Sequence, residues 1–273
     1  EHIVTIEKLI VGGNGLSRIQ FQEKSLVVFV PQTAPQDKVK IKITRTEKNH
    51  LLGEVVQIIE ASPSRLEAPC RYFEKCGGCN WQHINIETQL KEKEQILTDL
   101  LKKFVPQTSF KLLPTVKSEH NFNYRNRIQL KFLEGKFGYF QKSSHQIVDI
   151  DACLIAQKEI SDKISEVKTK LRQHKELQKF ELRINHLNQF EFYKIGEDGE
   201  GLSFSQVNNF VNAELTAKAV DLIKNLNPKF ITELYAGAGN FTFPLLEALQ
   251  RCSLRVSVDK FGIKLGDVLK RRI

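Results

Sequence analysis

The stretch CRYFEKCGGCNWQ constrains this chain most, because it places three of the five cysteines within ten positions. Cys70, Cys76 and Cys79 have the spacing C-x5-C-x2-C, and Cys153 follows far downstream. An odd number of cysteines does not favour a secreted disulfide framework, and clustered thiols in a reducing compartment more often bind metal or perform chemistry. A metal centre held by these thiols would join two distant segments of the fold.

Two kinds of metal centre suit such a cluster. Thiolates hold cubane iron–sulfur clusters, and Gly77 and Gly78 would allow a tight backbone path near the sulfides. Structural zinc also accepts thiolates, usually from pairs spaced by two to four residues. Unligated core cysteines are the third interpretation, which the crowding around Gly-Gly disfavours. The sequence therefore favours metal, and iron–sulfur over zinc. Cys252 stands alone in QRCSL and is interpreted as a small core residue.

Residues 1–60 are predicted to form short strands. SLVVFVP and KVKIKITRTE have strand composition, and GGNG at 12–15 and PQTAPQD at 31–37 are turn signals. Such closely spaced short strands predict a small antiparallel barrel of the OB type, which often binds nucleic acid. A purely structural β-domain fits the pattern equally well. We place this domain at 1–62 and interpret ASPSR, residues 61–65, as a linker.

The middle of the chain, 63–203, is predicted to be an α/β domain. INIETQLKEKEQILTDLLKKF has helical periodicity, which predicts a helix within 84–105 that could pack on the C-terminal domain. Strands are predicted within YRNRIQLKFLEGKFGYF, with EGK as a hairpin turn, and at HQIVDI. A charged helical segment follows Cys153, and the strand-like runs FELRINHL and FEFYKI come next.

The segment 204–273 has the pattern of a β-turn-α-β unit, the start of a doubly wound sheet. Gly237 and Gly239 would let the backbone approach a ligand beside a helix N-terminus, although the third glycine of a dinucleotide fingerprint is missing. Asp259 ends the next predicted strand, where a carboxylate can accept hydrogen bonds from a ribose diol. The pattern suits S-adenosylmethionine, and an ordinary tight turn is the alternative.

The charge points to a polyanionic partner. The net charge is +9 and the isoelectric point about 9.2. Phosphate contacts are predicted from basic side chains near Tyr124 and Phe132, and a solvated strand face explains them as well. These side chains are Arg125, Arg127, Lys131 and Lys136.

The sequence shows no signal peptide and no run long enough to span a bilayer, so we expect a cytoplasmic protein. It contains no methionine, not even an initiator, which suggests a fragment or missing residues.

Taken in order, these features resemble the RNA (uracil-5-)-methyltransferase family, in its subgroup with an N-terminal TRAM domain. GGNGLSRI and the following strands resemble TRAM, and CRYFEKCGGCNWQH resembles the family's iron–sulfur signature. YRNRIQLKF resembles its central domain, FSQVNN the stretch before the catalytic domain, and ELYAGAGNFTFPL its cofactor motif. The cysteine signature is highly specific, because Cys153 falls where the fourth ligand is expected.

The resemblance implies a multidomain α+β protein. An OB-like TRAM barrel would occupy 1–62, a central iron–sulfur α/β domain 63–203, and the start of a Rossmann-like methyltransferase domain 204–273. A [4Fe-4S] cluster would be held by Cys70, Cys76, Cys79 and Cys153. S-adenosyl-L-methionine would be bound around the glycine turn by Gln206, Tyr235, Gly237, Gly239, Asn240 and Asp259. Family members usually have Asp at the position of Glu233.

The implied activity is methylation of uracil C5 in RNA. Because C5 is a poor nucleophile, a cysteine thiolate adds to C6, the resulting enolate attacks the sulfonium methyl, and a base then removes the C5 proton. The target base must first leave its stack. The family's nucleophile and base motifs are absent from the sequence as given, so we predict no catalytic residue and interpret the chain as truncated or incomplete.

The favoured substrate is 23S ribosomal RNA, because the tRNA-specific branch of the family typically lacks the TRAM domain. We expect a monomer that does not bind membranes. A non-catalytic iron–sulfur RNA-binding protein is the alternative function. A radical methylthiotransferase also joins TRAM to an iron–sulfur site, but its C-x3-C-x2-C spacing does not occur here.

Overall fold

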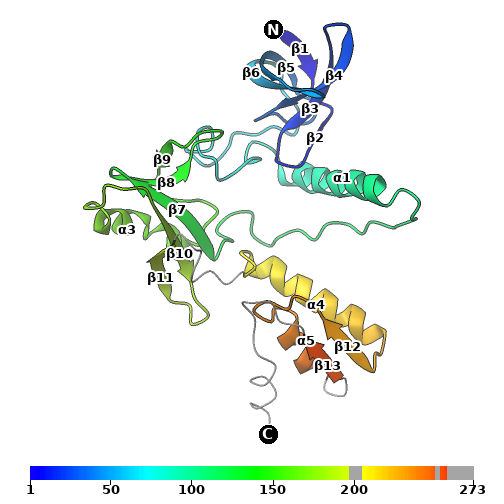
Figure 1. Ribbon diagram of the computed structural model, residues 1–273, viewed down its shortest axis with the longest axis vertical. Coiled ribbons are helices and arrows are strands. Elements are labelled where there is room, and N and C mark those ends of the chain that lie inside the picture. Colours follow the sequence, from blue (N-terminus) through cyan, green and yellow to red (C-terminus); the bar gives the residue numbers. More distant parts are fainter. Residues whose placement is uncertain (197–204, 250–252, 257–273) are drawn as a thin grey trace. The chain divides into compact units, whose positions relative to one another are not determined.

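The computed structural model describes residues 1–196, 205–249 and the backbone of 253–256 (Figure 1). The chain divides into two compact units. One comprises Glu1–Lys117 with Tyr139–Val148, and the other comprises Ser118–Gly138 with Asp149–Ile273. The domain boundaries at 62 and 203 stay predictions. None of the described helices is both long and apolar enough to cross a membrane.

The N-terminal strands form a six-stranded sheet in the order β1-β5-β6-β4-β3-β2. The strands are β1 (His2–Thr5), β2 (Lys8–Leu9), β3 (Gly15–Phe21), β4 (Lys24–Val30), β5 (Lys38–Thr46) and β6 (His50–Glu60). Most neighbours are antiparallel as predicted, but β4 and β6 pair in parallel.

The predicted closed barrel is not found among the described strands, because β1 and β2 stand at opposite ends of the strand order. The short link between β1 and β2 contacts the neighbour of each edge strand instead: the Ile6 N–H donates to the carbonyl of Asp37, just before β5, and the Glu7 N–H donates to the carbonyl of Leu16 in β3. With β2 only two residues long, the edges approach through this link and not through a strand ladder. The sheet therefore curls without closing.

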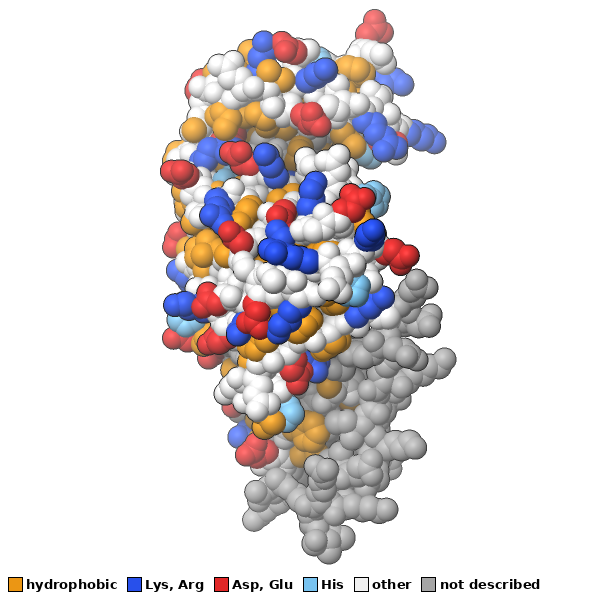
Figure 2. Space-filling model, turned by 90° about the vertical axis from the view of Figure 1, so that its left-hand side faces the viewer, with side chains coloured by type: hydrophobic (Ala, Val, Ile, Leu, Met, Phe, Trp, Pro, Cys, Tyr) orange, Lys and Arg blue, Asp and Glu red, His pale blue; other side chains and the backbone are white. Residues whose placement is uncertain are grey.

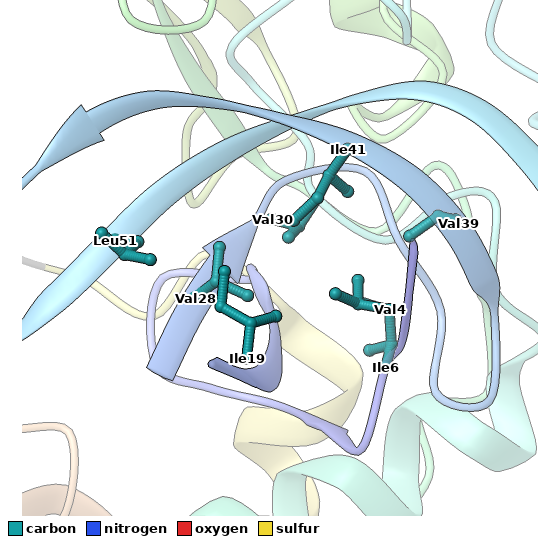
Figure 3. Packing of buried hydrophobic residues seen from close by; sticks show 8 residues of the cluster. All are labelled: Val4, Ile6, Ile19, Val28, Val30, Val39, Ile41 and Leu51. Carbon is teal, nitrogen blue, oxygen red and sulfur yellow. The ribbon is translucent and has the colours of Figure 1, made fainter. Parts of the chain in front are cut away.

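The inner face of this curled sheet carries the hydrophobic core (Figure 3). In β5, Val39 and Ile41 are fully buried while Lys38 and Lys40 are partly exposed, which is the period of two expected for a strand. The core side chains are Val4, Ile6, Ile19, Val28, Val30, Val39, Ile41 and Leu51.

ASPSR is bound to the sheet and is more than a connecting linker. The fully buried Asp37 accepts hydrogen bonds from the backbone N–H groups of Ala34, at 2.6 Å, and Ser62, at 2.8 Å. The Arg65 guanidinium donates to both Asp37 carboxylate oxygens, at 3.2 and 2.6 Å. Residues 61–65 therefore fix the chain direction as it enters the cysteine stretch.

The helix predicted within 84–105 forms as α1 (Ile86–Phe104), capped by the Asn85 side chain, which accepts from the Thr88 N–H at 2.8 Å. Its acidic face contacts β2. The Glu92 carboxylate accepts from the Leu9 N–H at 2.7 Å, and Asp99 pairs with Lys8 at 2.5 Å.

A second sheet has the order β11-β10-β7-β8-β9. Its strands are β7 (Arg127–Leu133), β8 (Lys136–Phe140), β9 (Ile147–Asp149), β10 (Gln178–Ile184) and β11 (Phe190–Lys194), with α2 (Lys158–Ser161) and α3 (Ile164–Lys170) between β9 and β10. The predicted EGK turn is confirmed: Glu134 and Gly135, with φ of 49° and 79°, adopt the left-handed conformation of a tight hairpin.

The predicted β-turn-α-β unit also forms. It contains α4 (Asn209–Asn225), β12 (Phe230–Glu233), α5 (Thr242–Ala248) and β13 (Ser253–Val256), and β12 pairs with β13 in parallel.

Candidate functional site

The cysteine stretch is held against the tip of the β8–β9 hairpin. The Gly77 N–H donates to the Phe140 carbonyl at 2.9 Å, and the Lys142 N–H donates to the Lys75 carbonyl at 3.2 Å. Cys76 forms an antiparallel bridge with Gln141 between these two bonds. The loop that carries three of the predicted ligands is therefore braced on a second segment of the chain.

The two glycines are required by close approach. A Cβ at Gly77 would lie 2.7 Å from the Phe140 carbonyl oxygen, a distance that side chains do not tolerate. The Gly78 N–H donates to the Cys76 sulfur at 3.4 Å, and a Cβ there would lie 3.4 Å from the same sulfur. An N–H aimed at a thiolate is a feature of iron–sulfur sites, where such bonds stabilise the charged sulfur.

The four predicted ligands are thiols in the structure. Cys70, Cys76 and Cys79 are half-buried, whereas Cys153 is buried and its N–H donates to the Ser161 hydroxyl at 2.9 Å. Within the described residues, no three Cys, His, Asp or Glu side chains gather closely enough to hold one metal ion. In a cubane cluster each thiolate binds a different iron, so four cysteines need not converge on one ion.

Two side chains beside the cysteine loop, Lys142 and His83, were not predicted from the sequence to belong to the site. The Lys142 ammonium lies 4.3 Å from the centre of the Phe73 ring, and burial lowers its pKa, against the effect of the Cys76 and Cys79 thiols. His83 is buried with its ring 5.3 Å from that of Phe73. Burial, and then the charge of Arg65, lower the pKa of His83 to about 4, so it is neutral at pH 7.

The glycine turn follows β12. Gly237 and Gly239 have φ of 56° and 83°, and the non-glycine Tyr235 has a φ of 56° with its side chain almost fully exposed. Left-handed backbone at a non-glycine residue is costly and is concentrated at ligand sites. The Glu233 carboxylate, which replaces the usual Asp, accepts from the Thr242 hydroxyl at 2.7 Å and so joins the strand to α5.

The two polar cofactor candidates are engaged in contacts within the fold. The Asn240 amide exchanges two hydrogen bonds with the Asn212 amide of α4, at 2.8 and 2.9 Å. Gln206 is half-buried, and its backbone carbonyl accepts from the Asn126 amide at 3.1 Å. Asp259 and Cys252 lie outside the described residues, so their predicted roles are not examined by the structure.

Two of the basic residues near Tyr124 lie on strand β7, whose side chains alternate between buried and partly exposed. Phe132 is fully buried, so it cannot stack on a base. Arg127 and Lys131 alternate with buried residues along β7, and burial, followed by the charge of Lys179, lowers the pKa of Lys131. On the face shown in Figure 2, basic and acidic side chains are interspersed and do not form a field of one sign.

An open pocket of about 450 Å³ lies in the second unit, and sequence reasoning did not predict it. Its aromatic lining comes from His120, Phe122 and Phe210, and its polar lining includes Asn188 and Lys158. The His120 and Phe210 rings meet edge to face with their centres 4.6 Å apart. Solvent-open aromatic rings with polar neighbours are the chemistry that single-stranded nucleic acid bases use.

Comparison with known proteins follows the same features. The TRAM domain family matches residues 3–56. An uncharacterized RNA methyltransferase of Bdellovibrio bacteriovorus is 43% identical over 89% of this chain and 61% of its own length. One of Aquifex aeolicus is 33% identical over 67% of this chain and 42% of its own length. The chain thus spans less than two thirds of the length of each of these two relatives.

Two further matches cover nearly the whole chain. The 23S rRNA (uracil(1939)-C(5))-methyltransferase RlmD of Haemophilus parainfluenzae is 27% identical over 91% of this chain and 68% of its own length. The crystal structure of Pyrococcus abyssi tRNA (uracil-54, C5)-methyltransferase in complex with S-adenosyl-L-homocysteine has a TM-score of 0.65 and 18% identity, covering 95% of this chain and 80% of that one. The last similarity concerns the fold alone. The chain therefore matches the TRAM domain family at its N-terminus and is similar over most of its length to proteins named as RNA methyltransferases.

Proposed function

We propose that this chain belongs to an enzyme that uses S-adenosyl-L-methionine to methylate C5 of uracil in ribosomal RNA. The observation that carries the proposal is the similarity, over 91% of the chain, to a protein named as a 23S rRNA uracil-C5 methyltransferase. That match leaves about a tenth of the chain uncovered. We further propose that the enzyme acts as a cytoplasmic monomer.

The glycine turn supports the cofactor assignment. Gly237 and Gly239 have positive φ angles and carry no side chain that could block a ligand. The exposed Tyr235 offers an aromatic ring beside this turn. In the proposed site, Gln206 and Asn240 contribute amide groups, and Asp259 accepts from the ribose hydroxyls.

Replacing Tyr235 with alanine is expected to weaken S-adenosyl-L-methionine binding, because an exposed ring that covers the cofactor contributes about 0.5–1.5 kcal/mol. Isothermal calorimetry measures the change. Tyr235→Phe keeps the ring and should bind nearly as well as the unchanged protein. A Tyr235→Ala variant with unchanged affinity would remove this residue from the proposed site.

The cysteine loop supports a [4Fe-4S] cluster bound by Cys70, Cys76, Cys79 and Cys153. Two observations favour it: the brace on the hairpin tip and the N–H aimed at the Cys76 sulfur.

The aromatic pocket is proposed to hold an unstacked base of the RNA. His120→Ala is expected to weaken binding of a uracil-containing rRNA fragment by about 1–3 kcal/mol, the usual contribution of one stacked base. Fluorescence anisotropy at fixed salt gives the dissociation constant. His174→Ala removes an exposed histidine of the same unit outside the pocket lining and should have no effect. Equal affinities for the unchanged protein and the His120→Ala variant would exclude the pocket as an RNA contact.

The activity is tested with the protein translated from the complete coding sequence that contains this chain. It is incubated with tritiated methyl donor and either 23S rRNA or tRNA, and the product nucleoside is identified by mass spectrometry. The proposal predicts 5-methyluridine in 23S rRNA. Label in tRNA alone would change the substrate, and tight RNA binding without transfer would favour the non-catalytic alternative.

A further inference from the structure

The ammonium group of Lys142 is a buried charge without a hydrogen-bond partner among the described residues. The Phe73 ring beneath it, at 4.3 Å, provides a cation–π contact. Taking an ammonium out of water costs far more than one such contact returns, so buried charges are normally paired with an opposite charge. The fold therefore holds this cation where something else must balance it.

The backbone of Lys142 lies beside the cysteine loop. Lys142 interacts electrostatically with both Cys76 and Cys79. Its backbone is fixed there, because the Lys142 N–H donates to the Lys75 carbonyl and the neighbouring Gln141 bridges Cys76. Neutral thiols do not balance a cation, whereas thiolates around a [4Fe-4S] core carry a net negative charge.

We propose that Lys142 is a positioning residue whose ammonium balances the negative charge of a thiolate-bound cluster at Cys76 and Cys79. The inference rests on the cluster proposed above. It predicts effects of opposite sign in two states: Lys142 stabilises the protein that contains the cluster and destabilises the protein without it. A merely structural lysine would act in the same direction in both states.

Lys142→Met tests the inference, because methionine keeps the apolar stem over Phe73 and removes the charge. In anaerobically purified protein, iron loss to a chelator is expected to be about 10- to 100-fold faster, the usual effect of losing a residue that supports metal ligands. The cluster's reduction potential should become more negative, because an added electron loses a nearby positive charge. The cluster-free variant should unfold at a higher temperature than the cluster-free parent.

Two control variants separate charge from shape and from distance. Lys75→Met removes an exposed charge next to Cys76 and should leave iron loss unchanged. Lys142→Arg keeps the charge and should lose iron more slowly than Lys142→Met.

Three results would each overturn the proposed role of Lys142. The first is iron loss from Lys142→Met at the parent rate, and the second is equally fast iron loss from Lys142→Arg and Lys142→Met. The third is a cluster-free Lys142→Met variant that unfolds at a lower temperature than the cluster-free parent. A parent protein without iron and acid-labile sulfide would overturn the cluster, and this inference with it. That result is distinguishable, because it appears before any variant is made.

Discussion

Replacing Cys153 with serine is expected to abolish stable binding of iron and acid-labile sulfide. Serine nearly preserves the volume of this buried side chain, and the backbone N–H that donates to Ser161 stays in place. A cubane with one iron left without its thiolate is open to solvent and loses its metal, because thiolates are its protein ligands. Iron and sulfide are quantified after anaerobic purification, together with the visible absorbance of the cluster.

Cys252→Ser is the matched control, since we interpret that residue as a core cysteine and not a ligand. It should keep the full iron content. Undiminished iron in Cys153→Ser would show that the fourth ligand is another group, and equal loss of iron in both variants would contradict the assignment of Cys153 as the specific ligand.

Replacing Asp37 with asparagine is expected to destabilise the N-terminal sheet by about 3–5 kcal/mol, the usual effect of removing one partner from a buried ion pair. Asp37 is fully buried, and the Arg65 guanidinium that donates to it would remain largely buried with its charge unbalanced. Such a loss is a large fraction of the stability of a small domain. Urea unfolding followed by circular dichroism measures it.

The exposed pair between Lys38 and Glu60 supplies the control. Glu60→Gln should change the unfolding midpoint little, because solvent screens exposed pairs. If the two substitutions had similar effects, the buried pair would not be an important source of stability.

The same pair gives a pH dependence. Burial raises the pKa of Asp37, but the hydrogen bonds from Arg65, Ala34 and Ser62 lower it more, so the pKa in the folded protein lies below its ordinary value. A carboxyl group with a lowered folded pKa contributes its full stability above the ordinary pKa, and that contribution is lost as pH falls through the folded value. Asp37→Asn should remove this component of the acid sensitivity.

Much of the local structure could be predicted from the sequence because local signals encode it. Alternating burial in β5, the helical period of α1 and the EGK turn each depend on residues within a few positions of one another. The glycine turn and the paired glycines of the cysteine loop were also visible, because glycine is favoured where backbone segments approach closely or φ is positive.

Burial and long-range partners were not predictable in this way. The parallel pairing of β4 with β6 depends on how the sheet curls, and the engagement of Asn240 with Asn212 depends on how α4 meets the turn. Strand alternation alone predicts that Phe132 is buried, as the structure has it. The prediction of phosphate contacts instead grouped Phe132 with the basic residues around it.

The sequence by itself determined the order of the motifs, the spacing of the cysteines and the family to which these point, because residue type and spacing are local chemistry. Only the tertiary structure decided that ASPSR is bound through a buried ion pair and that the Lys142 charge is buried beside two thiols. The physical reason is that the energy of a charge depends on which atoms replace its water. Those atoms come from segments that lie far apart in the chain.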